Sequence, residues 1–158
     1  MRPWPLFAVL LLACQQTSPP RAANGAAPAP SALPAEKTMS IDELAAALQK
    51  PPDQRPIVLH VGFHPLYEEG HIPGAIDLGA GATPEGQEAL AKELRSIPPG
   101  RQVVIYCGCC PADHCPNVRP AMRVARQIRG DVVSLDIPHS FRNDWKKRGL
   151  PVATGTSP

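Results

Sequence analysis

The chain has 158 residues, a formal net charge of +2 at neutral pH, 21 prolines and five cysteines. Its lysines and arginines are spread along the sequence apart from the short run Lys146-Lys147-Arg148. The sequence therefore lacks the basic patches expected of a nucleic-acid-binding protein. Residues 38–152 are enough for one hydrophobic core and too few for two.

Residues 1–13 have the composition of an export signal. Met1-Arg2 supplies positive charge, and the apolar run after it is far shorter than the roughly 20 residues that span a bilayer. The sequence Leu11-Leu12-Ala13-Cys14 resembles the lipobox of bacterial lipoproteins, which implies a signal peptide cleaved before a lipidated Cys14. Gln15 in the next position implies sorting to the outer membrane, on the periplasmic side of the cell envelope. The alternative is ordinary signal cleavage beyond Cys14.

Residues 14–37 are rich in alanine and proline and carry almost no charge. Such a segment cannot bury enough apolar surface to offset the entropy lost on ordering. We therefore expect a flexible, extended tether between the membrane and the folded domain. At the other end of the chain, we expect residues 153–158 to be a disordered tail.

Helices and strands alternate through residues 38–152. The sequence Ser40-Ile-Asp-Glu43 is a capping box, which predicts a helix over 41–49. Apolar runs typical of strands covered on both faces occupy 57–61, 103–106 and 132–135, and the turn at 70–76 leads into another short strand. Helical periodicity is found at 65–69, 84–95, 121–128 and 141–148. This alternation predicts an α/β domain with a central, mostly parallel sheet and helices on both faces.

Four of the five cysteines lie in the loop after the strand predicted at 103–106: Cys107, Cys109, Cys110 and Cys115. Parallel α/β sheets bind ligands at the carboxyl ends of their strands, so this loop lies where a functional site is expected. The loop also leads into the helix predicted at 121–128. The N-terminus of a helix favours an anion, and a thiolate or persulfide is one.

Three separated stretches resemble the rhodanese (sulfurtransferase) family. Tyr67-Glu-Glu-Gly-His-Ile-Pro-Gly-Ala-Ile76 resembles its N-terminal signature, Val103-Val-Ile-Tyr-Cys107 its active-site strand, and Trp145-x-x-x-Gly-Leu-Pro-Val152 its C-terminal signature. They follow the family's order and cover most of residues 38–152. The resemblance implies a single-domain rhodanese-like fold with a five-stranded sheet. It also implies that Cys107 carries sulfane sulfur as a persulfide and passes it to a nucleophilic acceptor.

The chain departs from the family pattern in three places. His60-Val-Gly62 occupies the position of the family's usual Asp-x-Arg, and Ile137-Pro138-His139 that of a Gly-Gly pair. Arg119, which matches the arginine that closes the family's short active-site loop, comes twelve positions after Cys107, so the loop contains an insertion. Prolines 111, 116 and 120 lack the N–H that a persulfide cradle would use. These departures leave the substrate and the activity open.

Three chemistries are open for the cysteine loop. In the first, Cys107 is the nucleophile, Arg119 lowers its pKa, and Cys110 or Cys115 is a resolving thiol, with Cys109 as a further secondary thiol. In the second, a zinc or monovalent copper ion is held by Cys107, Cys110, His114 and Cys115. In the third, the cysteines form inert disulfides, because export places the chain in an oxidising compartment. A bridge from Cys109 or Cys110 to Cys115 is then favoured over a vicinal bridge.

These observations predict an exported rhodanese-like protein. We expect sulfane-sulfur transfer or thiol–disulfide chemistry through a persulfide on Cys107, with a small sulfur donor and a thiol or protein acceptor. We expect no resident metal or cofactor, no nucleic-acid partner, and membrane contact through the lipid anchor alone. We expect His60 and His71 to be structural. The alternative is a non-catalytic module on the same fold that binds a metal or a partner.

Overall fold

The computed structural model describes Met1 and residues 37–156. The predicted signal peptide, the lipidation site Cys14, the tether as far as residue 36 and the last two residues lie outside the described residues. Within the described part of the chain, none of the helices is long and apolar enough to cross a membrane.

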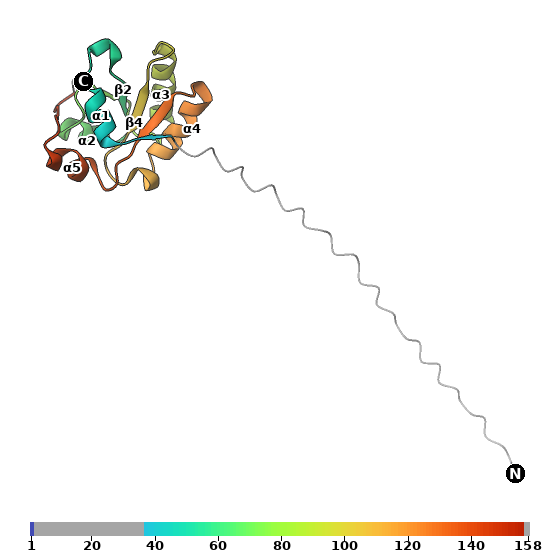
Figure 1. Cartoon of the computed structure of the whole chain (residues 1–158). Coiled ribbons are helices and arrows are strands. Elements are labelled where there is room, and N and C mark those ends of the chain that lie inside the picture. The colour runs from blue at the N-terminus through green and yellow to red at the C-terminus, as the bar shows by residue number, and fades with distance from the viewer. Residues whose placement is uncertain (2–36, 157–158) are drawn as a thin grey trace. The chain divides into compact units, whose positions relative to one another are not determined.

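The domain is built on a five-stranded sheet in which every pairing is parallel. The strands are Thr38–Met39 (β1), Ile57–His60 (β2), Ile76–Asp77 (β3), Val103–Tyr106 (β4) and Val132–Leu135 (β5). Their order across the sheet is β1-β5-β4-β2-β3, which places β4 in the centre (Figure 1). The predicted fold class is confirmed. The edge strand β1 was not identified from the sequence, because two residues are too few to show a periodicity.

The helices are Ile41–Ala47 (α1), His64–Glu69 (α2), Pro84–Ser96 (α3), Val118–Ile128 (α4) and Phe141–Asp144 (α5), with single 3₁₀ turns at Pro52–Gln54, Ala112–His114 and Lys146–Arg148. The capping box before α1 is present, because the Ser40 hydroxyl accepts from the Glu43 N–H and the Glu43 carboxylate accepts from the Ser40 N–H. α4 begins three residues before the expected start. Pro120 is tolerated there because the N–H groups of the first turn have no partner within the helix.

Successive side chains of the central strand face opposite sides of the sheet. Val103 and Ile105 pack in a core with residues of α3 and α4, such as Leu90 and Met122. Val104 and Tyr106 pack in a second core with residues of α1, α2 and α5: Leu44, Tyr67 and Phe141. Helices therefore cover both faces of the sheet, as predicted.

The ordered domain extends past its predicted end at Val152. The backbone N–H and carbonyl groups of Ala153 and His71 are bonded reciprocally, at 2.9 and 3.0 Å, and the Gly155 N–H donates to the carbonyl of Glu68. His71 is also buried, and its Nδ1 lies 2.8 Å from the Tyr67 carbonyl. The segment expected to open a disordered tail is thus held against α2, and the expectation that His71 is structural is confirmed.

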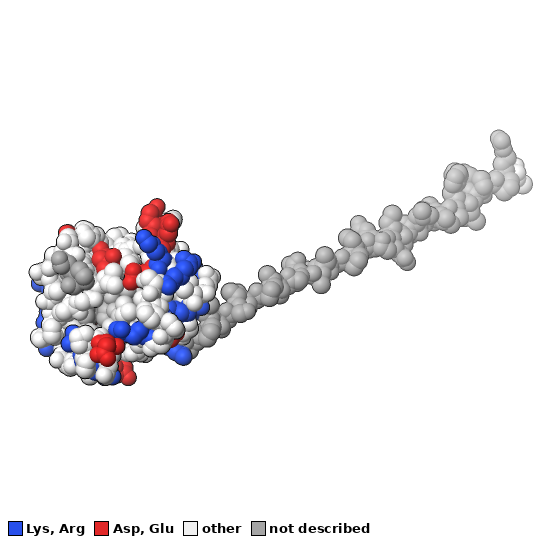
Figure 2. Space-filling view, turned by 90° about the horizontal axis from the view of Figure 1, so that it is seen from above, with Lys and Arg blue, Asp and Glu red and all other residues white. Residues whose placement is uncertain are grey.

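The surface in view in Figure 2 carries lysine and arginine side chains interspersed with aspartate and glutamate. Elsewhere in the described domain, an ion pair joins Arg129 Nε to Asp131 Oδ1 at 2.6 Å. Charges of mixed sign give the face in Figure 2 no continuous basic stripe of the kind that binds nucleic-acid backbones.

Candidate functional site

Cys107 follows directly on the last residue of β4, at the carboxyl end of the central strand. It continues the alternation of that strand, so its side chain packs in the core shared with α3 and α4, whereas Tyr106 packs on the other face. Only 3% of its surface is exposed. The sheet thereby fixes the position of the Cys107 sulfur, because Cys107 directly follows β4 whereas the other three cysteines lie further along the loop.

Gly108 turns the chain so that a second thiol meets the first. Its φ of +83° lies in the left-handed region, and a Cβ there would lie 2.8 Å from the Cβ of Phe141. The Gly108 carbonyl accepts from the Phe141 N–H at 2.9 Å, which fixes the turn. After this turn the Cys109 sulfur lies 3.3 Å from the Cys107 sulfur.

All four loop cysteines are free thiols, and their sulfur atoms are grouped. The Cys109 sulfur is 3.1 Å from that of Cys110 and 4.0 Å from that of Cys115. The sulfur atoms of Cys107, Cys109 and Cys115 all lie within 4.8 Å of one another. Cys107 and Cys115 are buried, while Cys109 is exposed. The loop therefore places an exposed thiol, that of Cys109, beside two buried ones, while Cys110 is half-buried.

The two buried thiols have opposite pKa shifts. The pKa of Cys115 is lowered to about 5, because its sulfur accepts hydrogen bonds from the Cys107 thiol and from the N–H groups of Val118 and Asn117 at the start of α4. The pKa of Cys107 is raised, because its thiol is bonded to Cys115 and is buried. The lower pKa of this interacting pair therefore belongs to Cys115. The lowering of the Cys107 pKa expected from the sequence is not found.

Arg119 does not produce the electrostatic effect expected from the sequence. It is the second residue of α4, its side chain is exposed, and no interaction described in the structure joins it to Cys107. The shift in the Cys107 pKa comes from the neighbouring thiols and from burial, and its direction is opposite to the one expected. The N–H groups at the start of α4 lower the pKa of Cys115 rather than that of Cys107. Whether Arg119 contributes to catalysis stays a prediction.

The four-ligand metal site that the sequence left open as an alternative is not assembled in the structure. The His114 side chain is 81% exposed and its Nδ1 pairs with Asp113 at 2.7 Å, so it points away from the thiols. The three sulfur atoms that converge are those of Cys107, Cys109 and Cys115, and Cys110 is not part of that group. His114 is not part of it because the 3₁₀ turn Ala112–His114 places its side chain on the outside of the loop.

His60 links the loop to the neighbouring strand. It is buried at the end of β2, with Nε2 3.0 Å from the Cys107 carbonyl and Nδ1 2.7 Å from Asp77 Oδ1. Burial lowers the pKa of His60, against the raising effect of Asp77. The other Asp77 oxygen lies 2.6 Å from Nδ1 of the exposed His64, and this hydrogen bond raises the pKa of His64. His60 thus has the structural role expected from the sequence, although its connection to His64 was not foreseen.

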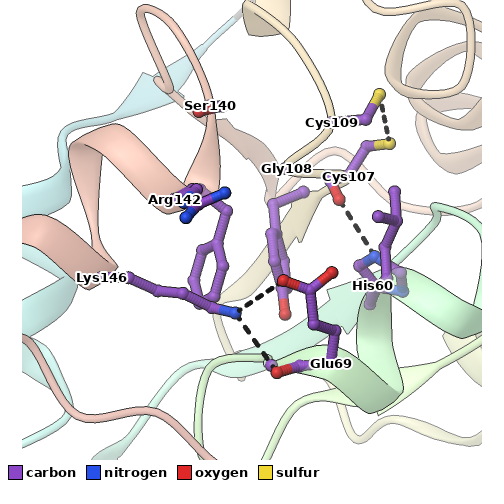
Figure 3. Close-up of a pocket in the computed structure, with 12 residues that line it drawn as sticks. His60, Glu69, Cys107, Gly108, Cys109, Ser140, Arg142 and Lys146 are labelled. Atoms are coloured by element: carbon purple, nitrogen blue, oxygen red, sulfur yellow. Dashed lines mark hydrogen bonds and ion pairs between the residues drawn. The ribbon is translucent and has the colours of Figure 1, made fainter.

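A pocket of about 280 Å³ opens beside the end of β4, on the side of α5. Cys107, Gly108 and Cys109 form one part of its wall, and Arg142 and Lys146 another. Figure 3 shows the sulfur atoms of Cys107 and Cys109 on one side of the view and the two basic side chains on the other. Lys146 Nζ lies 3.7 Å from a carboxylate oxygen of Glu69 and donates to the Glu69 carbonyl at 3.2 Å. The pocket therefore combines cationic groups with the edge of the thiol loop.

Several residues of the site were not identified from the sequence. Asn117 is buried, and its side-chain N–H lies 3.5 Å from the Cys107 sulfur while its side-chain oxygen accepts from the Ala82 N–H. An asparagine just before a helix is ordinarily interpreted as a capping residue, so nothing in the sequence indicated that Asn117 contacts the Cys107 sulfur. Neither Arg142 nor Lys146 was singled out as a site residue from the sequence, and the packing of α5 brings both to the pocket.

Comparisons with known proteins agree with this architecture. Residues 40–113 match the family model described as the rhodanese-like domain, and the match ends inside the cysteine loop. The crystal structure of a thiosulfate sulfurtransferase from Pseudomonas aeruginosa superposes with a TM-score of 0.56 and 18% identity, over 76% of this chain and 20% of that chain. The solution structure of a rhodanese-like domain from an Anabaena protein gives 0.53 and 19%, over 77% of this chain and 81% of that chain. At these identities the two structures establish the fold alone.

A match of higher identity is found with an HTH-type transcriptional regulator of Mycobacterium tuberculosis. It is 33% identical over 92 residues, which are 58% of this chain and 35% of the regulator. The chain thus matches about a third of that protein's length. The activity of the regulator as a whole does not transfer on such a partial match.

Proposed function

We propose that this chain, of which residues 40–113 match the model of the rhodanese-like domain, carries out sulfane-sulfur transfer or thiol–disulfide chemistry through a persulfide on Cys107. One observation carries the proposal. The Cys107 sulfur is fixed at the carboxyl end of the central strand, and the sulfur of the exposed Cys109 lies 3.3 Å from it. A persulfide on Cys107 would form within reach of a thiol that can discharge it.

The first step loads sulfur onto Cys107. With thiosulfate as donor, the Cys107 sulfur attacks the outer sulfur atom, the S–S bond of the donor breaks, and sulfite leaves with the bonding electron pair. Cys107 reacts as the thiolate, so its proton is released to the solvent before the attack. Charge balances, because the negative charge of the Cys107 thiolate is transferred to the new persulfide.

The second step discharges the persulfide. An external thiolate that attacks the outer sulfur atom takes it over, and Cys107 is released as a thiolate. In the internal route, the Cys109 sulfur attacks Cys107 Sγ, a disulfide between Cys107 and Cys109 forms, and hydrosulfide leaves with the proton of Cys109. The two thiols lose two electrons, and the transferred sulfur atom gains them. The two routes correspond to sulfur transfer and to thiol–disulfide chemistry.

The pocket on the α5 side supports a small anionic donor. Arg142 and Lys146 line it together with the backbone of the Cys107–Cys109 turn. Thiosulfate and polysulfides are small anions whose charge these side chains would complement. The exposed Cys109 provides access for a thiol or a protein acceptor at the same place.

The proposal is tested by mass spectrometry on the reduced protein after exposure to thiosulfate or a polysulfide. We expect a gain of one sulfur atom that maps to Cys107, and no gain in Cys107→Ser. Cys110→Ser is the matched control, because it removes a thiol from the same loop without touching Cys107 and should still take up sulfur. Absence of uptake from every donor in the wild-type protein would show that this fold serves another purpose.

We further propose that the protein is exported and anchored in the cell envelope through a lipid on Cys14. The support is the apolar signal and the lipobox-like Leu11-Leu12-Ala13-Cys14 sequence. Several acyl chains on one residue anchor a protein stably, where a single chain does not. The protein should therefore fractionate with membranes, and Cys14→Ser should release or mislocalise it. A wild-type protein that is recovered only as a soluble species with an unmodified N-terminus would contradict this.

A further inference from the structure

We propose that Cys107, Cys109 and Cys115 form a binding site for one soft monovalent metal ion, of which Cu(I) is the representative. This inference does not depend on sulfur transfer, and it replaces the ligand set expected from the sequence. It rests on three sulfur atoms that converge from one loop without forming a disulfide.

The spacing of the three sulfur atoms fits a single metal ion. They lie 3.3 Å apart for Cys107 and Cys109, 4.0 Å apart for Cys109 and Cys115, and all within 4.8 Å of one another. A metal with metal–sulfur bonds of about 2.3 Å in a trigonal plane holds its sulfur ligands about 4.0 Å apart. Small movements of the exposed Cys109 would bring all three to this separation.

The number of converging ligands favours Cu(I) over zinc. Structural zinc sites are almost always tetrahedral and need four protein ligands. Here the converging group has three members, because Cys110 lies outside it and His114 is turned to solvent beside Asp113. Cu(I) prefers soft thiolate ligands and is satisfied by three of them.

The surroundings of the three sulfur atoms hold them in place. The Asn117 side chain donates to Cys107, and the N–H groups of Asn117 and Val118 donate to Cys115. Such outer hydrogen bonds orient metal ligands and stabilise their charge. Cys115 is fully buried, whereas Cys109 is exposed and provides the path of entry for the ion. The site is therefore closed on the side of α4 and open at one ligand.

Metal binding and sulfur transfer would exclude each other. Both use the lone pairs of the Cys107 sulfur, so a bound ion prevents attack on a sulfur donor. The metal-loaded protein should take up no sulfur, and removal of the ion should restore uptake if the proposed sulfur transfer is also correct.

The test is a titration of the reduced full-length protein with Cu(I) in the absence of oxygen, against a chromophoric Cu(I) chelator. We expect one equivalent to bind, with X-ray absorption showing three sulfur neighbours. Cys109→Ser should weaken binding by at least about a hundredfold, because loss of even an outer partner costs roughly ten- to a hundredfold. Cys109 is exposed, so this variant should keep its fold, which circular dichroism checks. Cys110→Ser and His114→Ala are the matched controls and should bind as the wild type does.

Three results would overturn the site. The first is the absence of tight Cu(I) binding. The second is a loss of affinity in Cys110→Ser or His114→Ala as large as that in Cys109→Ser. The third is zinc held in preference to Cu(I) by four ligands. Sulfur uptake at Cys107 is measured separately on the metal-free protein, so failure of one proposal leaves the other standing.

Discussion

Two regions of different chemistry meet at the end of β4. On the side of α4 lie four thiols, with Cys107 and Cys115 buried and their pKa values shifted in opposite directions. On the side of α5 lies an open pocket with Arg142 and Lys146. The alternation of the strand separates them, because Tyr106 and Cys107 face opposite sides. The difference teaches that neighbouring thiols and backbone N–H groups set the pKa values of the thiols, while the anionic donor that we propose would meet the cations of the pocket.

The sharpest test of the thiol region is the titration of Cys115. Its pKa of about 5 lies well below the ordinary value, so an ultraviolet thiolate band should persist until the pH falls to about 5 and should be absent in Cys115→Ser. Cys110→Ser should keep the band, since burial raises the pKa of Cys110 to about 12. A depressed pKa stabilises the folded state above the unfolded value, and this contribution is lost as the pH falls through about 5. A band that disappears already near pH 8 to 9, as for an ordinary cysteine, would contradict the assignment.

Gly108→Ala should destabilise the turn after β4, which lies between the two regions. The substitution forces a non-glycine residue into positive φ and drives a Cβ against Phe141. We expect a loss of about 1–3 kcal/mol in the free energy of unfolding, from the strained backbone alone, and a further loss from the contact. The measurement is chemical denaturation. Gly74→Ala is the control, because it has a similar φ of +81° and open space around the added methyl group. Equal effects of the two substitutions would show that the Phe141 contact is unimportant.

The proposed role of the basic pocket residues is tested by Arg142→Ala. A partly solvated charge contributes up to about 1 kcal/mol, so the KM for an anionic sulfur donor should rise about two- to fivefold while kcat changes little. The effect should shrink with added salt. Lys147→Ala removes an exposed charge on the neighbouring 3₁₀ turn that does not line the pocket, and it should leave the KM unchanged. If both variants behave alike, the pocket does not recognise the donor.

The smallest effect is expected for Arg119→Ala. Its side chain is exposed and has no described interaction with the thiols, so the Cys115 titration and the rate of sulfur loading should both stay within about twofold of wild type, the scale of surface charge effects. Steady-state loading rates check this. A large loss would restore Arg119 to the role that the rhodanese resemblance implied.

Most of the fold was predictable from the sequence, because it depends on local patterns. Burial is visible in the sequence as the apolar runs of β2, β4 and β5. The start of α1 is visible as the Ser40–Glu43 capping box. The facing of Cys107 toward α4 also follows from the alternation of β4. What the sequence could not show is the path of the loop after Gly108. That path decides that Cys115, rather than Cys107, reaches the N–H groups of α4, and that His114 points outward.

The basic residues of the pocket were hidden for a different reason. Arg142 and Lys146 lie on α5 and the turn after it, far from Cys107 in sequence, and they reach the pocket through the packing of Phe141 and Trp145 in the core. Side chains that meet only through tertiary packing produce no periodic pattern in the sequence, so their contact cannot be predicted from it.

The central claim is that a persulfide on Cys107 is discharged by the thiol in contact with it. The most direct measurement loads the reduced, metal-free protein with isotope-labelled sulfane sulfur and follows both the label and the disulfides by peptide mapping. We predict that the label appears first on Cys107, that a disulfide between Cys107 and Cys109 follows as labelled hydrosulfide is released, and that Cys109→Ser prolongs the labelled persulfide. A label that appears first on Cys109, Cys110 or Cys115, or a persulfide lifetime unchanged in Cys109→Ser, would contradict the claim.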